Sequence, residues 1–286
     1  MPTKVTIQQE KDFAANMAQL MEIMKGLALA SYVKLKKAKE KRFEGFVKAF
    51  DVFFHITDLT KAKSPFIQNE CPTLGVVLVT SEESFMSGLN SKVVRLGLET
   101  VGKLPCEFMV TGKKGGSRLK MEGLEFTTFP PLKEKHFYSI AVQIKDYIVK
   151  RVKERKMGKV IGIFADPVSF SLQRATAVNF LPAHDVYPKE MNQDVDPNDK
   201  IYQESSIDQI MDYLCEIWIT NKLYMMFQDN KMAEFASQAM QLEGSLQNLS
   251  ELNRKLKLQY VKKRGEGIDS SLREVVTALI ATGGGS

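Results

Sequence analysis

Residues 111–117 are the part of the sequence whose composition comes nearest to a phosphate-binding site. They read Thr-Gly-Lys-Lys-Gly-Gly-Ser and follow a predicted strand, as a phosphate-binding loop does. The full pattern of such a loop, with a lysine and a hydroxyl residue directly after the second glycine, is absent. No second acidic strand end supplies a magnesium ligand either. We therefore expect a glycine-rich turn that joins a strand to a helix.

A second candidate, residues 80–84, follows another predicted strand and reads Thr-Ser-Glu-Glu-Ser. Open α/β sheets commonly bind ligands at such strand ends. The carboxylates of Glu82 and Glu83 would repel a phosphate, so we expect a solvated loop here.

Other catalytic and metal-binding patterns are missing from the sequence. The three histidines are His55, His136 and His184, and none has a second His or Cys at the spacing of a zinc site. No Gly-x-Ser-x-Gly motif singles out a nucleophilic serine. Three widely spaced cysteines are typical of free thiols in a reducing compartment. We expect no cofactor, no metal site and no catalytic residue in this chain.

The composition is that of a folded protein. Of 286 residues, 44% are hydrophobic and 26% are charged, which excludes collagen-like and wholly disordered chains. This length suits one large domain or two modest ones. No apolar run reaches the ~18–20 residues of a membrane-spanning helix, and the first residues show neither a secretory signal nor a legible import presequence.

Residues 1–63 are predicted to form one long helix. No proline interrupts residues 12–63, and apolar residues recur at steps of four and three, the spacing of a coiled-coil seam. The predicted seam consists of Phe13, Met17, Leu20, Met24 and Leu27. A basic block follows at residues 34–42. Because it is rich in lysine and lacks interleaved aromatic residues, we expect it to meet water or an acidic protein surface and not nucleic acid.

Residues 64–182 show the pattern of an inserted α/β domain. Short runs rich in β-branched residues alternate with amphipathic stretches. We predict strands at residues 74–80, 106–111, 160–164 and 171–180, and helices at residues 91–102 and 136–155. This alternation predicts helices packed against a mostly parallel sheet, a Rossmann-like arrangement. Residues 183–204 are acidic and contain prolines, so we expect an exposed linker there.

Residues 205–286 are predicted to form a second, longer helix. Its apolar positions step by four and three from Phe235 to Tyr260, with Asn253 as the one polar member, and resume at Ile268 after a stutter. About 75 helical residues span on the order of 110 Å, so this apolar stripe needs a partner. The first helix has the same period. The fold class that we predict is therefore α/β, with a long antiparallel coiled coil of the N- and C-terminal helices and an inserted Rossmann-like domain.

This layout and several local motifs resemble the gamma subunit of F-type ATP synthase. That family's first helix has a Lys- and Met-rich stretch ending in Ala-Ser-Lys, similar to Met-Lys-Gly-Leu-Ala-Leu-Ala-Ser-Tyr at residues 24–32. Its Thr-Ser/Thr-Asp-Arg-Gly-Leu-Cys-Gly-x-x-Asn loop resembles residues 80–90, without the Arg-Gly-Leu-Cys core. Its Val-Gly-Lys-Lys-Gly turn resembles residues 110–115. Residues 237–249 and 260–275 are similar to its C-terminal segments, so the resemblance runs nearly end to end.

The resemblance implies a rotor that transmits torque from a proton-driven c-ring to catalytic β subunits. The paired helix ends would stand inside an α3β3 ring that binds ATP, ADP and magnesium, and the inserted domain would sit with δ and ε on the c-ring. The chain itself would hydrolyse nothing. Contacts with partners are expected at Lys25, Lys34, Lys36, Lys37, Arg264, Gly265, Gly267, Ile268, Asp269 and Leu272. Since the family's arginine is Gln238 here and residues 264–269 differ from its motif, individual polar contacts are not carried over.

Residues 242–248, Leu-Glu-Gly-x-Leu-x-Asn, are more similar to divergent mitochondrial members of that family. This similarity implies the matrix side of the mitochondrial inner membrane, with the cytoplasmic side of a bacterial plasma membrane as the alternative. Two other classes of protein stay open. A structural coiled-coil tethering protein with no ATPase partner would explain the seams, and a small-molecule enzyme on residues 65–182 would need a pocket with convergent ionisable groups.

Overall fold

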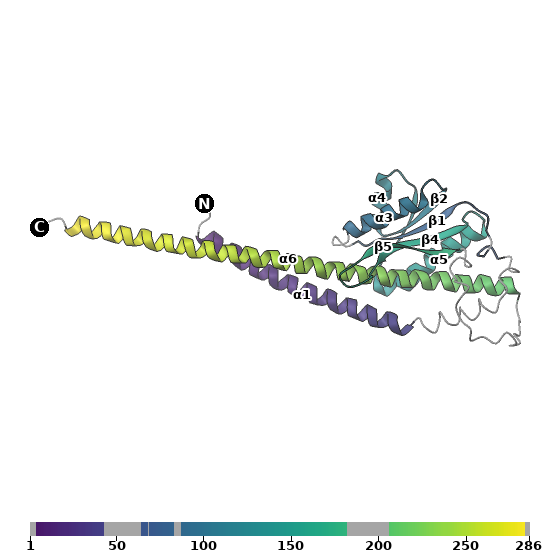
Figure 1. Cartoon of the computed structure of the whole chain (residues 1–286), viewed down its shortest axis with the longest axis horizontal. Coiled ribbons are helices and arrows are strands. Elements are labelled where there is room, and N and C mark those ends of the chain that lie inside the picture. The colour runs from purple at the N-terminus through teal and green to yellow at the C-terminus, as the bar shows by residue number, and fades with distance from the viewer. Residues whose placement is uncertain (1–3, 43–63, 68, 83–86, 182–205, 284–286) are drawn as a thin grey trace. The chain divides into compact units, whose positions relative to one another are not determined.

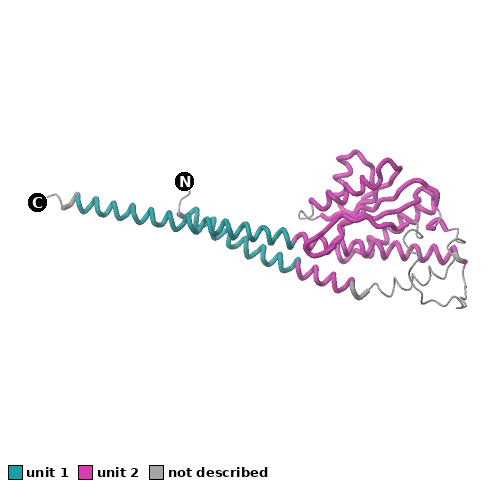
Figure 2. Tube along the Cα trace, in the orientation of Figure 1, with its two compact units in different colours: residues 1–28, 239–286 teal, residues 29–238 magenta. Residues whose placement is uncertain are grey.

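The computed structural model describes residues 4–42, 64–67, 69–82, 87–181 and 206–283 (Figure 1). Two units are distinguished, unit 1 with residues 1–28 and 239–286 and unit 2 with residues 29–238 (Figure 2). The elements are α1 (Lys4–Arg42), β1 (Leu74–Val79), α3 (Ser87–Val101), β2 (Cys106–Thr111), α4 (Lys113–Met121), β3 (Phe126–Phe129), the 3-10 turn η3 (Glu134–His136), α5 (Phe137–Lys153), β4 (Lys159–Asp166), β5 (Arg174–Leu181) and α6 (Ile207–Gly283).

Two of the predicted segments fall outside the described residues. The second half of the first helix, residues 43–63, is one of them, and the acidic linker at residues 183–204 is the other. The predicted domain boundaries lie beside these segments.

Unit 2 contains a five-stranded sheet in the order β3-β2-β1-β4-β5. The first four of these strands are parallel, and β5 pairs with β4 in the antiparallel sense. All six residues of β1 are buried, because a central parallel strand is covered on both faces. The prediction of a mostly parallel sheet is therefore confirmed. The short strand β3 was missed, since its four residues, Phe-Thr-Thr-Phe, lie at an edge and are only partly buried.

Helices cover both faces of the sheet, as predicted. Val77 and Val79 of β1 pack on one face with buried residues of α5 and α6. Val76 and Leu78 pack on the opposite face with residues of α3 and α4. The alternation follows from the two-residue period of a strand. Figure 1 shows α3 and α4 on the side of the sheet away from α5.

The glycine-rich segment that was expected to be a turn is mostly helix, since α4 begins at Lys113. Gly112 has φ of 79°, a left-handed conformation that favours glycine. A Cβ on Gly115 would lie 2.5 Å from Thr80 Oγ1, and one on Gly116 would lie 2.7 Å from a ring carbon of Phe126. The glycines therefore allow α4 to pack closely against the sheet, which explains their spacing without a phosphate.

In unit 1, the first part of α1 lies beside the α6 residues that directly follow residue 238, and the two helices run in opposite directions (Figure 2). Lys25 is paired with Glu243, and the ammonium of Lys11 lies over the ring of Tyr260. Residue numbers thus rise along one helix as they fall along the other, which confirms the predicted antiparallel pair. None of the helices within the described ranges is long and apolar enough to cross a membrane.

Candidate interaction surfaces

The α6 side of the helix pair follows the predicted seam. Ala239, Leu242 and Leu256 are buried, and the seam positions between and after them are partly buried. Asn253 is the polar residue of this face, as predicted, and its side-chain oxygen is buried without a hydrogen-bond partner. A period of four and three therefore predicted the pairing face of this helix correctly.

The α1 side of the pair departs from the predicted seam at three of its five positions. Phe13, Leu20 and Leu27 are 67%, 50% and 64% exposed, whereas Met17 and Met24 are partly buried, as predicted. The buried positions are Ile7, Ala14 and Ala28, with Met21 partly buried between the alanines. The prediction was wrong for the three large residues because two stripes with the same seven-residue period lie next to each other on α1. The pairing stripe carries alanine, which lets the two helix backbones approach.

Large apolar side chains consequently form an exposed stripe on α1 within unit 1. Phe13, Leu20, Ile23 and Leu27 are all at least half exposed. At ~100° per residue they fall within roughly 80° of the helix circumference. A contiguous exposed apolar stripe of this kind marks an interaction surface. None of these four residues was predicted to contact a partner.

The end of α6, residues 264–280, is exposed along its whole length. Apart from Val276 and Ile280, which are 52% and 71% exposed, its large apolar residues are Ile268, Leu272, Val275 and Leu279, and these four are between 52% and 65% exposed. They share one face, which lies roughly 100° around the helix from the seam. The helix is continuous here, so the predicted stutter is a change of face and not a break. The predicted contact residues Arg264, Gly265, Gly267 and Asp269 are exposed on the same stretch.

Lys25, another predicted contact residue, is held within unit 1. Its ammonium lies 2.8 Å from Glu22 and 2.9 Å from Glu243. The hydrogen bond to Glu22, followed by that to Glu243, raises the pKa of Lys25. This lysine therefore joins the two helices, and only part of its side chain faces solvent.

The basic block on α1, in unit 2, divides into exposed and paired lysines. Lys34, Lys36 and Lys37 are exposed, and Lys34 lies 3.8 Å from the carboxylate of Glu134. Lys39 donates a 2.6 Å hydrogen bond to Asp229 of α6. Lys34, Lys36 and Lys37 are thus the described lysines of the block whose charge is exposed to solvent.

The carboxyl ends of β1 and β2 are filled by the chain's own side chains. The backbone amide of Lys113, at the start of α4, donates to the carboxylate of Glu82. A helix N-terminus attracts anions, so Glu82 lies where a phosphate would bind. Thr80 and Ser81 are buried, at 1% and 3% exposure, so the expected solvated loop is wrong for these two residues. Glu83 and Ser84 lie outside the described ranges.

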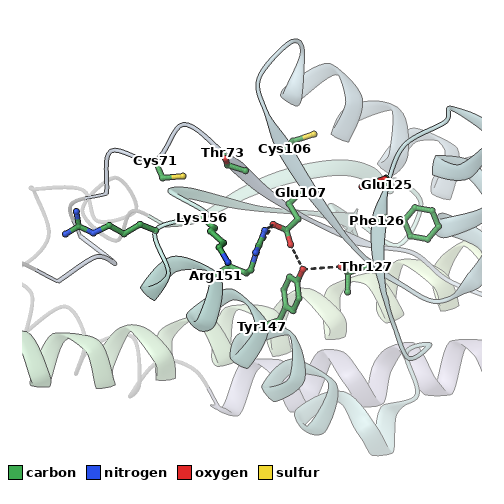
Figure 3. A pocket seen from close by; sticks show the side chains of 11 residues that line it. Cys71, Thr73, Cys106, Glu107, Glu125, Phe126, Thr127, Tyr147, Arg151 and Lys156 are labelled. Carbon is green, nitrogen blue, oxygen red and sulfur yellow. Dashed lines mark hydrogen bonds and ion pairs between the residues drawn. The ribbon is translucent and has the colours of Figure 1, made fainter.

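The amino ends of β1, β2 and β3 border a cavity of about 640 Å³. Glu107 on its floor accepts hydrogen bonds of 2.9 and 2.6 Å from Arg151 and one from the hydroxyl of Tyr147 (Figure 3). Thr127 lies 3.2 Å from the same hydroxyl. Burial and the bond to Glu107 raise the pKa of Tyr147. Arg151, Glu107 and Tyr147 therefore form hydrogen bonds with one another, and these bonds stabilise the amino-terminal end of the sheet.

Cysteines and histidines give no reactive or metal-binding cluster in the described part of the chain. Cys71 and Cys106 line the larger cavity as free thiols, and burial raises the pKa of Cys106. His136 borders a smaller cavity of about 260 Å³ at the start of α5. His55 and His184 lie outside the described ranges.

A family model described as ATP synthase matches residues 6–281. The ATP synthase gamma chain of Chlorobium phaeobacteroides is 22% identical over 298 residues, which cover 98% of this chain and 99% of the relative. The chain belongs to the family of ATP synthase gamma chains. The gamma chain of Halothermothrix orenii is 23% identical over 89% of this chain and 91% of its own.

Solved structures of ATP synthases contain chains with the same fold as this one. The chain superposes on one from the mitochondrial ATP synthase of Euglena gracilis with a TM-score of 0.67 and 16% identity, covering 98% of this chain and 94% of the other. A chain of the central stalk and c-ring of Tetrahymena thermophila mitochondrial ATP synthase gives a TM-score of 0.58 and 16% identity, with 79% and 99% covered.

The predicted contact residues of this gamma-chain family member fall into two sets. Unit 1 carries Lys25 and the positions from Arg264 to Leu272, and unit 2 carries the three exposed lysines of the basic block. Sequence reasoning missed the exposed stripe on α1. The sequence shows this stripe as a second seven-residue period on α1, which the prediction took for the face that pairs with α6.

Proposed function

We propose that this chain is the rotor shaft in the central stalk of an F-type ATP synthase. In this role it transmits torque from a proton-driven c-ring to subunits that make ATP. The observation that carries the proposal is the end of α6 in unit 1. There a single exposed helix with an apolar face continues for about fifteen residues past the level at which α1 begins. Membership of the gamma-chain family supports the same role.

The partner that we propose for this helix end is an α3β3 hexamer that binds ATP, ADP and magnesium. Apolar contacts are non-directional, so a helix with an apolar face can turn inside an apolar collar with few hydrogen bonds to break. The exposed stripe on α1 adds a second apolar surface in unit 1. Each orientation of the helix pair would favour a different conformation of the surrounding catalytic sites.

The other proposed partners are the δ and ε subunits and the c-ring, which would meet the α/β part of the chain. Lys34, Lys36 and Lys37 are proposed to meet acidic partner surfaces, since they are exposed on one short stretch of α1. We place catalysis in the partner subunits. The hydrogen bonds among Arg151, Glu107 and Tyr147 support this assignment, because they engage these three groups with one another.

We propose that the complex is peripheral to a membrane, on the matrix side of the mitochondrial inner membrane. The motif at residues 242–248 supports this location. The bacterial relatives make the cytoplasmic side of a bacterial plasma membrane the alternative. Fractionation of cells that express the tagged chain, with protease protection of the isolated organelles, distinguishes the two.

The experiment that tests the rotor function is purification of the native complex through a tag on this chain. We expect two P-loop subunits at three copies each per copy of this chain, with magnesium-dependent ATPase activity. A homodimer without a nucleotide-binding partner would contradict the rotor and support a tethering coiled coil. Binding of a small molecule by the cavity at the amino ends of the strands would support the enzyme class instead.

A charge-reversed variant tests the basic block within the same complex. Lys34→Glu, Lys36→Glu and Lys37→Glu together should lower the yield of the assembled complex while the isolated chain keeps its unfolding midpoint. A matched control changes charge equally at exposed lysines elsewhere, namely Lys92→Glu, Lys103→Glu and Lys120→Glu. Equal loss of assembly in both triple variants would refute a specific role for the block.

A further inference from the structure

The carboxyl ends of β1 and β4 are the place where an open α/β sheet of this topology commonly binds ligands. The helices that follow β1 and β2 lie on one face of the sheet, and α5, which follows β3, lies on the other. Strands β2 and β3 are added on one side of β1 and strand β4 on its other side, so β1 and β4 form the switch point of the sheet. In this protein Asn230 and Glu234 of α6 form hydrogen bonds at these strand ends.

Three polar side chains of α6 bind three different elements of unit 2. Asn230 accepts a 3.1 Å hydrogen bond from the backbone amide of Ala165 in β4. Glu234 accepts a 2.5 Å hydrogen bond from the hydroxyl of Ser81, just after β1. Asp229 accepts the 2.6 Å hydrogen bond from Lys39 of α1. We call Asp229, Asn230 and Glu234 the polar clamp.

The polar clamp is buried and its partners are themselves fixed. Asn230 and Glu234 are 1% and 3% exposed, and Lys231 forms an ion pair with Glu234. The backbone of Ser81 is held from the other side by Asn90 of α3, which bonds both its amide and its carbonyl. A shift of α6 would therefore leave buried polar groups without partners, which is more costly than a shift of apolar contacts.

The clamp residues are arranged around the axis of α6. At ~100° per residue, Asp229, Asn230 and Glu234 span roughly 140° of its circumference. Rotation of the helix in either direction would stretch at least one of the three bonds. Between them lies Ala233, which is fully buried and packs with the core on the α3 side of the sheet.

We propose that the polar clamp fixes α6 against rotation about its own axis, so that torque passes between the α/β sheet and the long helix at the carboxyl ends of β1 and β4. These residues act as positioning residues in the rotor and touch no nucleotide. The inference rests on the proposed rotor function and adds to it the residues through which torque enters the shaft.

The test uses the assembled complex in sealed vesicles. Protons pumped per ATP hydrolysed are measured at several opposing proton gradients. The variants are Ser81→Ala and Glu234→Gln, alone and together, because each removes part of one clamp bond with little change of shape. Glu251→Gln, at an exposed position of the same helix, is the matched control.

With the clamp weakened, we expect the pumping ratio to equal that of the wild type without a gradient and to fall roughly twofold or more at a high gradient. A helix that rotates against the sheet when the opposing proton gradient is high would lower the pumping ratio only at a high gradient. A variant that is only less stable loses complex, pumping and hydrolysis in proportion, so its ratio stays constant. In the isolated chain, Asn230→Ala should speed hydrogen exchange at the amide of Ala165.

The possible outcomes distinguish a failure of the polar clamp from a failure of the rotor function. If the wild type couples and the variants match Glu251→Gln at every gradient, the clamp is refuted and the rotor stands. If the wild-type chain forms no coupled complex, the rotor function fails and the torque path fails with it. Unchanged exchange at Ala165 in Asn230→Ala would refute the geometry of the clamp directly.

Discussion

Leu256 and Leu258 of α6 offer a direct comparison of the buried and exposed faces of the helix pair. They are the same residue type, two positions apart, and therefore on nearly opposite sides of the helix. Leu256 is 6% exposed and Leu258 is 66% exposed. Replacing each with alanine changes helix propensity equally, so any difference in stability comes from burial.

The expected magnitudes follow from these exposures. Truncation of a buried leucine costs the transfer free energy of the lost carbons plus a cavity term, about 2–5 kcal/mol. Because Leu256 lies in a two-helix seam that can relax, we expect the low end, about 2–3 kcal/mol. Leu258→Ala should stay within ~0.5 kcal/mol of the wild type, as exposed positions do.

Hydrogen exchange of the α1 amides in the isolated chain measures the opening of this pair. A loss of ~2 kcal/mol corresponds to roughly 30-fold faster exchange, which we expect for Leu256→Ala and not for Leu258→Ala. Equal acceleration of exchange in both variants would refute the seam described for α6.

Three further predictions concern unit 2 and α6. Gly115→Ala should lower the free energy of unfolding by about 1–3 kcal/mol, because its Cβ would lie 2.5 Å from a threonine hydroxyl. Gly244→Ala should raise the free energy of unfolding by about 0.5–1 kcal/mol, since no heavy atom lies within 4 Å of the added Cβ. Urea unfolding measures both changes, and a change of the same sign in the two variants would contradict the close packing of α4. Burial raises the pKa of Asp229. In the folded chain the carboxyl of Asp229 therefore keeps its proton at pH values at which the same carboxyl has lost it in the unfolded chain. Because of this difference, the contribution of Asp229 to the free energy of unfolding falls as the pH rises through that range. Asp229→Asn should remove this contribution, measured by unfolding between about pH 4 and 7. Burial raises the pKa of Cys215 to about 12, so iodoacetamide at about pH 8 should label Cys71 and spare Cys215 until the chain is denatured, as peptide mass mapping would show.

The sequence predicted the sheet well because its central strands are buried on both faces. Such strands are continuous apolar runs, and β1 and β2 were predicted within one residue of their observed bounds. Edge strand β3 has no such run. The start of α4 was hidden because glycine lowers helix propensity. Only the contact with Thr80 and Phe126 shows why glycine is needed there.

Periodicity predicted that two helices pair, but not which stripe of α1 faces α6. Side-chain size favoured Phe13, Leu20 and Leu27, whereas the pair buries alanines and the stem of Lys25. A seven-residue repeat fixes the spacing of a stripe and leaves its angular position open. The large residues are left exposed, where the partner subunits that we propose would meet them.

The polar clamp could not be read from the sequence, because Ser81 and Glu234 are 153 residues apart and neither belongs to a motif. Their meeting explains how a fold that resembles a nucleotide-binding domain serves as part of a shaft. At the carboxyl ends of β1 and β4, where a sheet of this topology commonly binds a ligand, Asn230 and Glu234 form hydrogen bonds with the chain itself, and the N-terminus of α4, which would attract a phosphate, is bonded to Glu82. Buried hydrogen bonds are directional, so in the torque path that we propose these side chains resist rotation of α6.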